Sequence, residues 1–155
     1  MLQPGDPIPD AQVWTAPREL PVTLVEALGK ADLTLLCFYP FDWSQTCTNE
    51  IFLLRDRGSD LERAGIRPVA ISRDSPWSHE AWVMTLGVDD VPLLSDWSGE
   101  ATRGFGVSRE LYGMAGVPDR CAFLITGDTV RASWYLGSEL PDIDAAIAAA
   151  SSLSL

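Results

Sequence analysis

Residues 33–50 read LTLLCFYPFDWSQTCTNE, and they pass from an apolar run through a polar loop into a stretch with helical spacing. The run 33–39 is short and nearly continuous, and Pro40 ends it. Such a run is typical of a strand that is buried on both faces of a sheet. We therefore expect the central strand of the fold at 33–39, followed by a loop over 40–45.

A helix is expected after this loop. It should begin near Thr46 or Cys47 and continue to Gly65, because glycine commonly ends helices. Its buried face is marked by apolar residues at helical spacing, namely Ile51, Leu54, Leu61 and Ala64.

The next segments continue the alternation of strands and helices. Residues 66–72 read as a second buried strand, and 75–86 as a helix in which Pro76 suits the first turn. This order implies a parallel βαβ unit. A short strand at 92–95 and a brief helix at 100–105 are expected to follow.

The C-terminal part predicts an antiparallel hairpin and a last helix. Segments 121–126 and 130–136 are apolar, and Gly127-Asp128 lies between them. Glycine tolerates the positive φ that tight hairpin turns often require, so the two segments should pair. From Asp142 onward, apolar residues share one face of a helix that should pack on the sheet.

The organisation of the chain indicates one domain. Residues 1–12 hold three prolines and are expected to form an extended lead-in. No internal repeat or linker divides the rest, so 1–155 should be a single domain. The predicted elements place it in the α/β class, with a mixed sheet flanked by helices.

The charge balance excludes several classes of partner. The chain has 11 Lys+Arg against 22 Asp+Glu, a formal charge of −11. Such an acidic surface repels phosphate backbones and anionic lipids, so neither nucleic acid nor a membrane surface is an expected partner. The apolar runs are shorter than the ~20 residues of a spanning helix, and residues 1–6 lack the features of a secretory signal. These observations predict a cytoplasmic location.

The cysteines favour neither a disulfide scaffold nor a metal site. They are Cys37, Cys47 and Cys121, an odd number at spacings that do not match a zinc knuckle. With His79 as the single histidine, a four-ligand zinc site would need every cysteine and histidine of the chain. We therefore expect no metal and no other cofactor.

Cys47 opens the expected helix, and this position favours a reactive thiolate. Backbone N–H groups in a first helical turn lack intrahelical partners and carry about +0.5 charge, which stabilises a thiolate. Ser44 can offer its hydroxyl to the sulfur or to an oxygen bound beside it, and Pro40 can shield the pocket from water. Cys47 is therefore the candidate nucleophile.

These residues resemble the motif of the peroxiredoxins, Pro-x-x-x-Thr/Ser-x-x-Cys, present here as Pro40, Ser44 and Cys47. The resemblance includes Glu50 and Arg120 and covers nearly the whole chain. Other residues that carry it are Asp74, Ser75, Ser78, His79, Glu80, Ala81, Trp82, Phe123, Leu124 and Ile125. It implies a thioredoxin-like three-layer sandwich in which a central mixed sheet is flanked by helices.

The resemblance also implies an activity, a thiol-dependent peroxidase that reduces hydrogen peroxide or small organic hydroperoxides. Cys47 would attack the terminal peroxide oxygen and become a sulfenic acid, with release of water or an alcohol. Arg120 would be its charged partner, and Ser44 and the Cys47 N–H would complete the donors. Glu50 would orient the arginine. The family further implies a homodimer.

Departures from the family pattern point to a one-cysteine mechanism. Thr48 stands where many two-cysteine members have proline, and this difference points toward the AhpE-like or bacterioferritin-comigratory branches. Phe52 stands where the latter branch often has its resolving cysteine. Cys37 and Cys121 are predicted to be small buried hydrophobes, with Cys121 facing away from Cys47. The reductant should therefore be an external thiol or a thioredoxin-like protein.

Alternative interpretations remain for the chain and for individual residues. The chain could be a non-catalytic redox sensor or interaction partner with a thioredoxin fold, in which slow oxidation of Cys47 changes an interface. His79 is predicted to be structural, and Asp42 to be a loop residue. The six tryptophans, among them Trp43, Trp77 and Trp82, could line a pocket for organic peroxides or could fill cores and interfaces.

Overall fold

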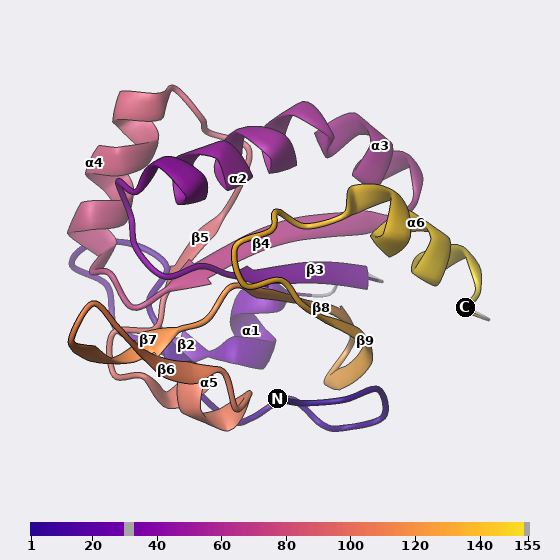
Figure 1. Cartoon of the computed structure of the whole chain (residues 1–155), viewed down its shortest axis with the longest axis horizontal. Coiled ribbons are helices and arrows are strands. Elements are labelled where there is room, and N and C mark those ends of the chain that lie inside the picture. Colours follow the sequence, from indigo (N-terminus) through magenta and orange to yellow (C-terminus); the bar gives the residue numbers. More distant parts are fainter. Residues whose placement is uncertain (30–32, 154–155) are drawn as a thin grey trace.

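The computed structural model describes residues 1–29 and 33–153 and is built on a five-stranded sheet (Figure 1). Its middle strand is β3 (Leu33–Phe38), which pairs in parallel with β4 (Ile66–Ser72) and antiparallel with β8 (Cys121–Thr126). The predicted central strand is therefore confirmed, and the sheet is mixed.

Two further pairings complete the sheet, in the order β5-β4-β3-β8-β9. Strand β5 (Leu93–Ser95) is parallel to β4, and β9 (Thr129–Tyr135) is antiparallel to β8. The expected hairpin with its turn at residues 127–128 is present, as is the short strand near 92–95.

Helices cover one face of this sheet, as Figure 1 shows. The core on this side joins alternate β3 residues to side chains of four helices. These are α2 (Gln45–Asp56), α3 (Gly58–Arg63), α4 (Pro76–Leu86) and α6 (Ile143–Ser151). The other β3 residues pack into a second core with α1 (Leu24–Leu28) and α5 (Glu100–Gly104). All six residues of β3 are buried, and the predicted thioredoxin-like α/β fold with helices on both faces is confirmed.

The helix that was expected from Thr46 or Cys47 to Gly65 differs from the structure in two ways. It begins at Gln45, because Ser44 caps its N-terminus. It is also divided into α2 and α3 at Arg57, which has φ −96° and ψ 10° and is followed by Gly58. Glycine is a poor helix former, and this weakens the continuity that the apolar spacing indicated.

Two small sheets were not predicted. One pairs β1 (Gln12–Val13) with β2 (Val22–Thr23), and the other is a hairpin of β6 (Ser108–Leu111) and β7 (Met114–Pro118). Strand β6 is exposed along most of its length, so it shows no alternation of buried and exposed residues that a pattern could detect.

The proline-rich N-terminal segment crosses the sheet edge as an extended chain. Gly5 N donates to Val130 O, and Ile8 N donates to Asp128 O, so the segment docks beside β9. In the part of the chain that the structure describes, no helix is long and apolar enough to cross a bilayer.

Candidate active site around Cys47

Cys47 lies in the first turn of α2, directly behind the loop that leaves β3. Ser44 is the N-cap residue, and its Oγ accepts a hydrogen bond from Cys47 N at 3.2 Å. This cap fixes the start of the helix. It also engages the Cys47 N–H, which was expected to be among the donors for a substrate. The hydroxyl hydrogen of Ser44 remains as a donor.

Arg120 precedes β8 and reaches Cys47 across 73 residues of sequence. Its Nη2 donates to Cys47 Sγ at 3.3 Å, and its Nη1 donates to Glu50 Oε1 at 2.8 Å. Cys47 is 1% exposed, Glu50 is fully buried and Arg120 is 4% exposed. The structure thus brings together three of the residues that the family motif singles out.

Burial and charge act against each other at this cluster. Desolvation lowers the pKa of Arg120, but Glu50 and Cys47 raise it, and the net shift is above its ordinary value. The guanidinium therefore stays charged beside the sulfur, where it stabilises a thiolate. Burial raises the pKa of Glu50 to about 7, although Arg120 opposes this shift.

The titration of Glu50 predicts a pH dependence of stability. Between pH 4.5 and about 7 the folded chain keeps a proton on Glu50 that the unfolded chain has released. The free energy of unfolding should therefore fall as pH rises through this window, by on the order of 3 kcal/mol. The side chain of Glu50→Gln does not titrate. The free energy of unfolding measured in urea should therefore depend less steeply on pH in this variant than in the wild-type chain. Asp74 and Asp96, whose pKa values burial also raises, contribute equally to both proteins. Identical slopes in the two proteins would contradict this assignment.

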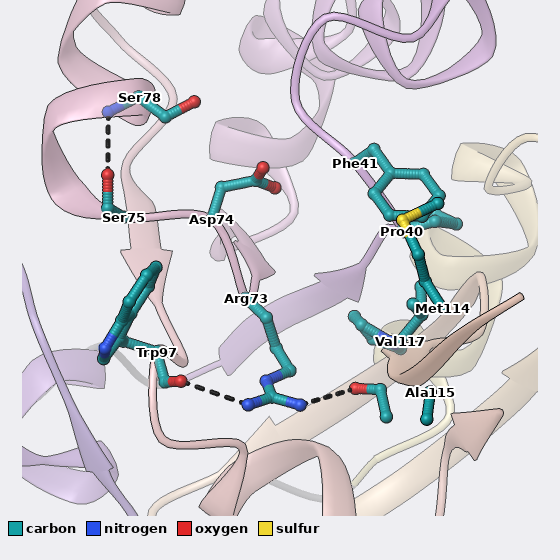
Figure 2. A pocket seen from close by; sticks show the side chains of 12 residues that line it. Pro40, Phe41, Arg73, Asp74, Ser75, Ser78, Trp97, Met114, Ala115 and Val117 are labelled. Atoms are coloured by element: carbon teal, nitrogen blue, oxygen red, sulfur yellow. Dashed lines mark hydrogen bonds between the residues drawn. The ribbon is translucent and has the colours of Figure 1, made fainter. Parts of the chain in front are cut away.

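Pro40 is separated from the end of β3 by one residue and lies in the wall of a cavity. It makes no hydrogen bond to Cys47, Glu50 or Arg120. It lines that cavity together with Phe41, the next residue of the loop (Figure 2). The predicted site residues therefore form two adjoining parts, the Cys47–Arg120–Glu50 cluster with its Ser44 cap, and the cavity wall at Pro40.

A buried polar network anchors the loop between β3 and α2. Tyr39 Oη donates to Asp42 Oδ1 at 2.7 Å, and Ser78 Oγ donates to Asp42 Oδ2 at 2.8 Å. His79 Nδ1 lies 2.8 Å from Asp42 Oδ2, and its Nε2 lies 3.1 Å from Leu94 O. Both ring nitrogens of His79 are therefore engaged, one by Asp42 and the other by the backbone of β5.

This network corrects the interpretation of Asp42 as a loop residue only. Asp42 is 6% exposed and joins the loop to α4, while its backbone N donates to Asp74 Oδ2 at 3.0 Å. His79 has the structural surroundings that were predicted for it. The signal that could have found the network is the pair Tyr39 and Asp42, polar groups on either side of the proline that ends a buried strand.

Trp43, the next residue of the loop, has an uncommon backbone conformation with φ 73°. This left-handed region is unfavourable for a bulky residue and persists only where the surroundings hold it. Trp43 Nε1 donates to Ser78 Oγ at 3.3 Å, which ties the side chain to α4. Trp43 and Trp77 are about half exposed, whereas Trp82 is fully buried in the core.

Cys37 and Cys121 are free, fully buried thiols. Burial raises the pKa of the Cys37 thiol and of the Cys121 thiol above their ordinary values. Cys121 belongs to the core on the sheet face opposite to the one that holds Cys47, as the strand alternation predicted. Both side chains therefore have the surroundings of small buried hydrophobes.

The fold and the site together define a thioredoxin-fold protein with an arginine-paired cysteine at a helix N-terminus. The chain belongs to the AhpC/TSA family, whose model matches residues 4–133.

Known proteins similar to the chain are peroxiredoxins. A Caenorhabditis elegans protein named probable peroxiredoxin prdx-3 is 38% identical over 109 residues, which are 66% of this chain and 47% of that protein. A bovine protein named mitochondrial thioredoxin-dependent peroxide reductase is 36% identical over 92 residues, 56% of this chain and 36% of that protein. The crystal structure of peroxidoxin BcpB from Mycobacterium tuberculosis covers 100% of both chains, with a TM-score of 0.82 and 25% identity. The chain thus spans half or less of the length of these two curated relatives.

Proposed function

We propose that the chain is a thiol peroxidase that reduces hydrogen peroxide or small organic hydroperoxides through Cys47. The observation that carries this proposal is the contact of Arg120 Nη2 with Cys47 Sγ at 3.3 Å, in the first turn of α2. The guanidinium places a positive charge at the sulfur, where negative charge develops on the peroxide oxygens during the reaction.

In the proposed reaction, the Cys47 thiolate attacks the terminal oxygen of the hydroperoxide. The new S–O bond forms as the O–O bond breaks, so the sulfur is oxidised to a sulfenic acid and the peroxide is reduced. The departing oxygen takes a proton and leaves as water or an alcohol. Arg120 and the Ser44 hydroxyl are the donors that face the developing negative charge on the peroxide oxygens.

The other two site residues support this arrangement. Glu50 accepts from Arg120 Nη1 at 2.8 Å and is proposed to hold the guanidinium toward the sulfur. Pro40 is proposed to limit the access of water to Cys47, because it lies in the cavity wall at the start of the loop that leads to Cys47. Both assignments rest on position and on the family motif.

An external reductant is proposed to regenerate Cys47. The other two cysteines are fully buried, and one of them lies on the far side of the sheet, which supports a mechanism without an internal disulfide. A related bovine protein is named thioredoxin-dependent, so a dithiol protein of this kind is the reductant that we propose.

Stopped-flow tryptophan fluorescence tests the proposed function. Reduced protein mixed with hydrogen peroxide should show a fast phase that depends on peroxide concentration and is absent in Cys47→Ser. A thiol count after oxidation should find two free thiols, because Cys37 and Cys121 stay reduced. One remaining thiol would instead show an internal resolving cysteine. No fast phase, with hydrogen peroxide or with organic hydroperoxides, would overturn the peroxidase and favour the redox sensor.

We also propose that the chain forms a homodimer in the cytoplasm. Trp43, in the loop before α2, and Trp77, in the first turn of α4, are both about half exposed. Exposed aromatic residues are common at interfaces. A monomer in light scattering would contradict the dimer. The cytoplasmic location rests on composition alone, and fractionation of cells that produce the protein tests it.

A further inference from the structure

A cavity of about 600 Å³ adjoins the candidate active site (Figure 2). Its volume lies within the range of small-molecule pockets, which is roughly 300–1,000 Å³. Phe41, Met114 and Val117 form an apolar side, and Ser75 and Ser78 form a polar side. The cavity shares Pro40 with the candidate site, and Pro118 in its wall is two residues before Arg120, whereas Cys47 itself does not line it.

Arg73 forms the base of this cavity. Figure 2 shows its guanidinium between two backbone carbonyls, with Nη1 donating to Gly116 O at 3.0 Å and Nη2 donating to Trp97 O at 3.2 Å. These bonds hold the guanidinium in place and use one hydrogen of each terminal nitrogen, so each nitrogen keeps a second hydrogen to donate.

The charge of Arg73 opposes the burial-raised pKa of the nearby Asp96, but the two groups do not form an ion pair. No carboxylate in residues 1–29 or 33–153 lies within ion-pair distance of its guanidinium. The nearby Asp96 has both oxygens bound, one by Ala101 N at 3.0 Å and the other by the backbone and hydroxyl of Thr102. A positioned guanidinium at the base of a cavity is a strong site for a carboxylate, because bidentate pairs of this kind are charge-assisted.

We propose that this cavity binds the carboxylate-bearing tail of an organic hydroperoxide, with its carboxylate on Arg73 and its peroxide group reaching Cys47 past Pro40. The catalytic part rests on the proposed function, with the same reaction: the thiolate takes the terminal oxygen, and the rest of the molecule leaves as the corresponding alcohol. The apolar side at Phe41 and Met114 would pack against the hydrocarbon part.

Two features of the molecule sharpen the expected selectivity. The chain has a formal charge of −11, so anions are repelled except close to a cation that no carboxylate contacts directly. Asp74 is in the cavity wall, and its Oδ2 is already bound by Asp42 N and by Ser72 Oγ. Its charge would repel a carboxylate placed at that end, so the tail should bind in one orientation, with its carboxylate at the Arg73 end.

Calorimetric titration tests the binding without the chemistry. The probes are octanoate and its uncharged methyl ester, added to the Cys47→Ser protein. Octanoate should bind at least about tenfold more tightly than the ester, and Arg73→Met should abolish the difference. Equal affinities, or a difference that persists in Arg73→Met, would overturn the inference.

A second variant guards against loss of the fold, because Arg73 also joins β7 to the segment after β5. Met114→Glu leaves both carbonyl contacts intact and places a negative charge on the apolar side of the cavity. Met114 is 46% exposed, so the substitution should be tolerated. The Met114→Glu substitution should weaken the binding of octanoate more than the binding of the methyl ester. An unchanged octanoate affinity would place the carboxylate elsewhere and so contradict the proposed site.

Kinetics then separates this inference from the proposed function. The rates of Cys47 oxidation by a fatty acid hydroperoxide and by its methyl ester are compared within each protein. The acid-to-ester ratio should be at least about ten in the wild-type chain and near one in Arg73→Met. If no peroxide oxidises Cys47 while Arg73-dependent octanoate binding remains, the proposed function fails and the binding site stands. If Cys47 reacts rapidly with an acid-to-ester ratio near one, the function stands and the site fails.

Discussion

The Arg120→Met variant should react with hydrogen peroxide at least about a hundredfold more slowly than the wild-type chain. Methionine keeps most of the buried volume but removes the donor that lies 3.3 Å from Cys47 Sγ. It also removes the fixed positive charge that stabilises the thiolate and the developing charge on the peroxide. Loss of one such preorganised donor typically costs a factor of 10² to 10³. The measurement is the second-order rate of the fluorescence phase in stopped flow.

Two further variants make this result specific to the geometry. Arg120→Lys keeps the charge but lacks the two terminal nitrogens that donate to Cys47 and Glu50 at the same time. Its rate of reaction with peroxide should therefore lie between those of the wild type and Arg120→Met. Arg63→Met removes an arginine from the exposed end of α3 and should leave the rate unchanged. A loss of only a few fold in Arg120→Met would favour the redox sensor over the peroxidase.

The central layer of the fold was predictable from the sequence because its signals are local and strong. The run 33–39 is apolar except for Thr34, and such a run has few alternatives to a strand buried on both faces. The hairpin around residues 127–128 was equally predictable, since a glycine-containing turn separates two apolar segments. The β6–β7 hairpin was missed because its strands lie mostly at the surface, where the sequence need not alternate.

The site was predictable only in part, for a similar physical reason. The position of Cys47 at a helix start follows from local pattern, but its contact with Arg120 spans 73 residues and required the family motif. No motif indicated that the carboxylate of Asp42 would be buried against α4. That arrangement depends on how the loop packs after folding, and it includes the left-handed backbone of Trp43, which only the surroundings stabilise.

Replacing Asp42 by alanine should reduce the free energy of unfolding by about 3 kcal/mol, because each buried donor that loses its acceptor costs about 1 to 3 kcal/mol. The carboxylate holds three side chains, with Tyr39 and Ser78 as hydroxyl donors and His79 Nδ1 at 2.8 Å. Alanine would leave these donors buried without an acceptor, and desolvated groups of this kind are costly. Urea unfolding measures the change.

Matched variants locate this effect in the buried network. Asp42→Asn keeps one acceptor and the shape of the side chain, so its loss should be smaller than that of Asp42→Ala. Asp89→Ala removes an exposed carboxylate and should change the free energy of unfolding by less than about 0.5 kcal/mol. The loop anchored by Asp42 also carries the Ser44 cap of α2, so the folded Asp42→Ala protein should react more slowly with peroxide as well. A variant as stable and as fast as the wild type would show that the network does not hold the loop that presents Cys47.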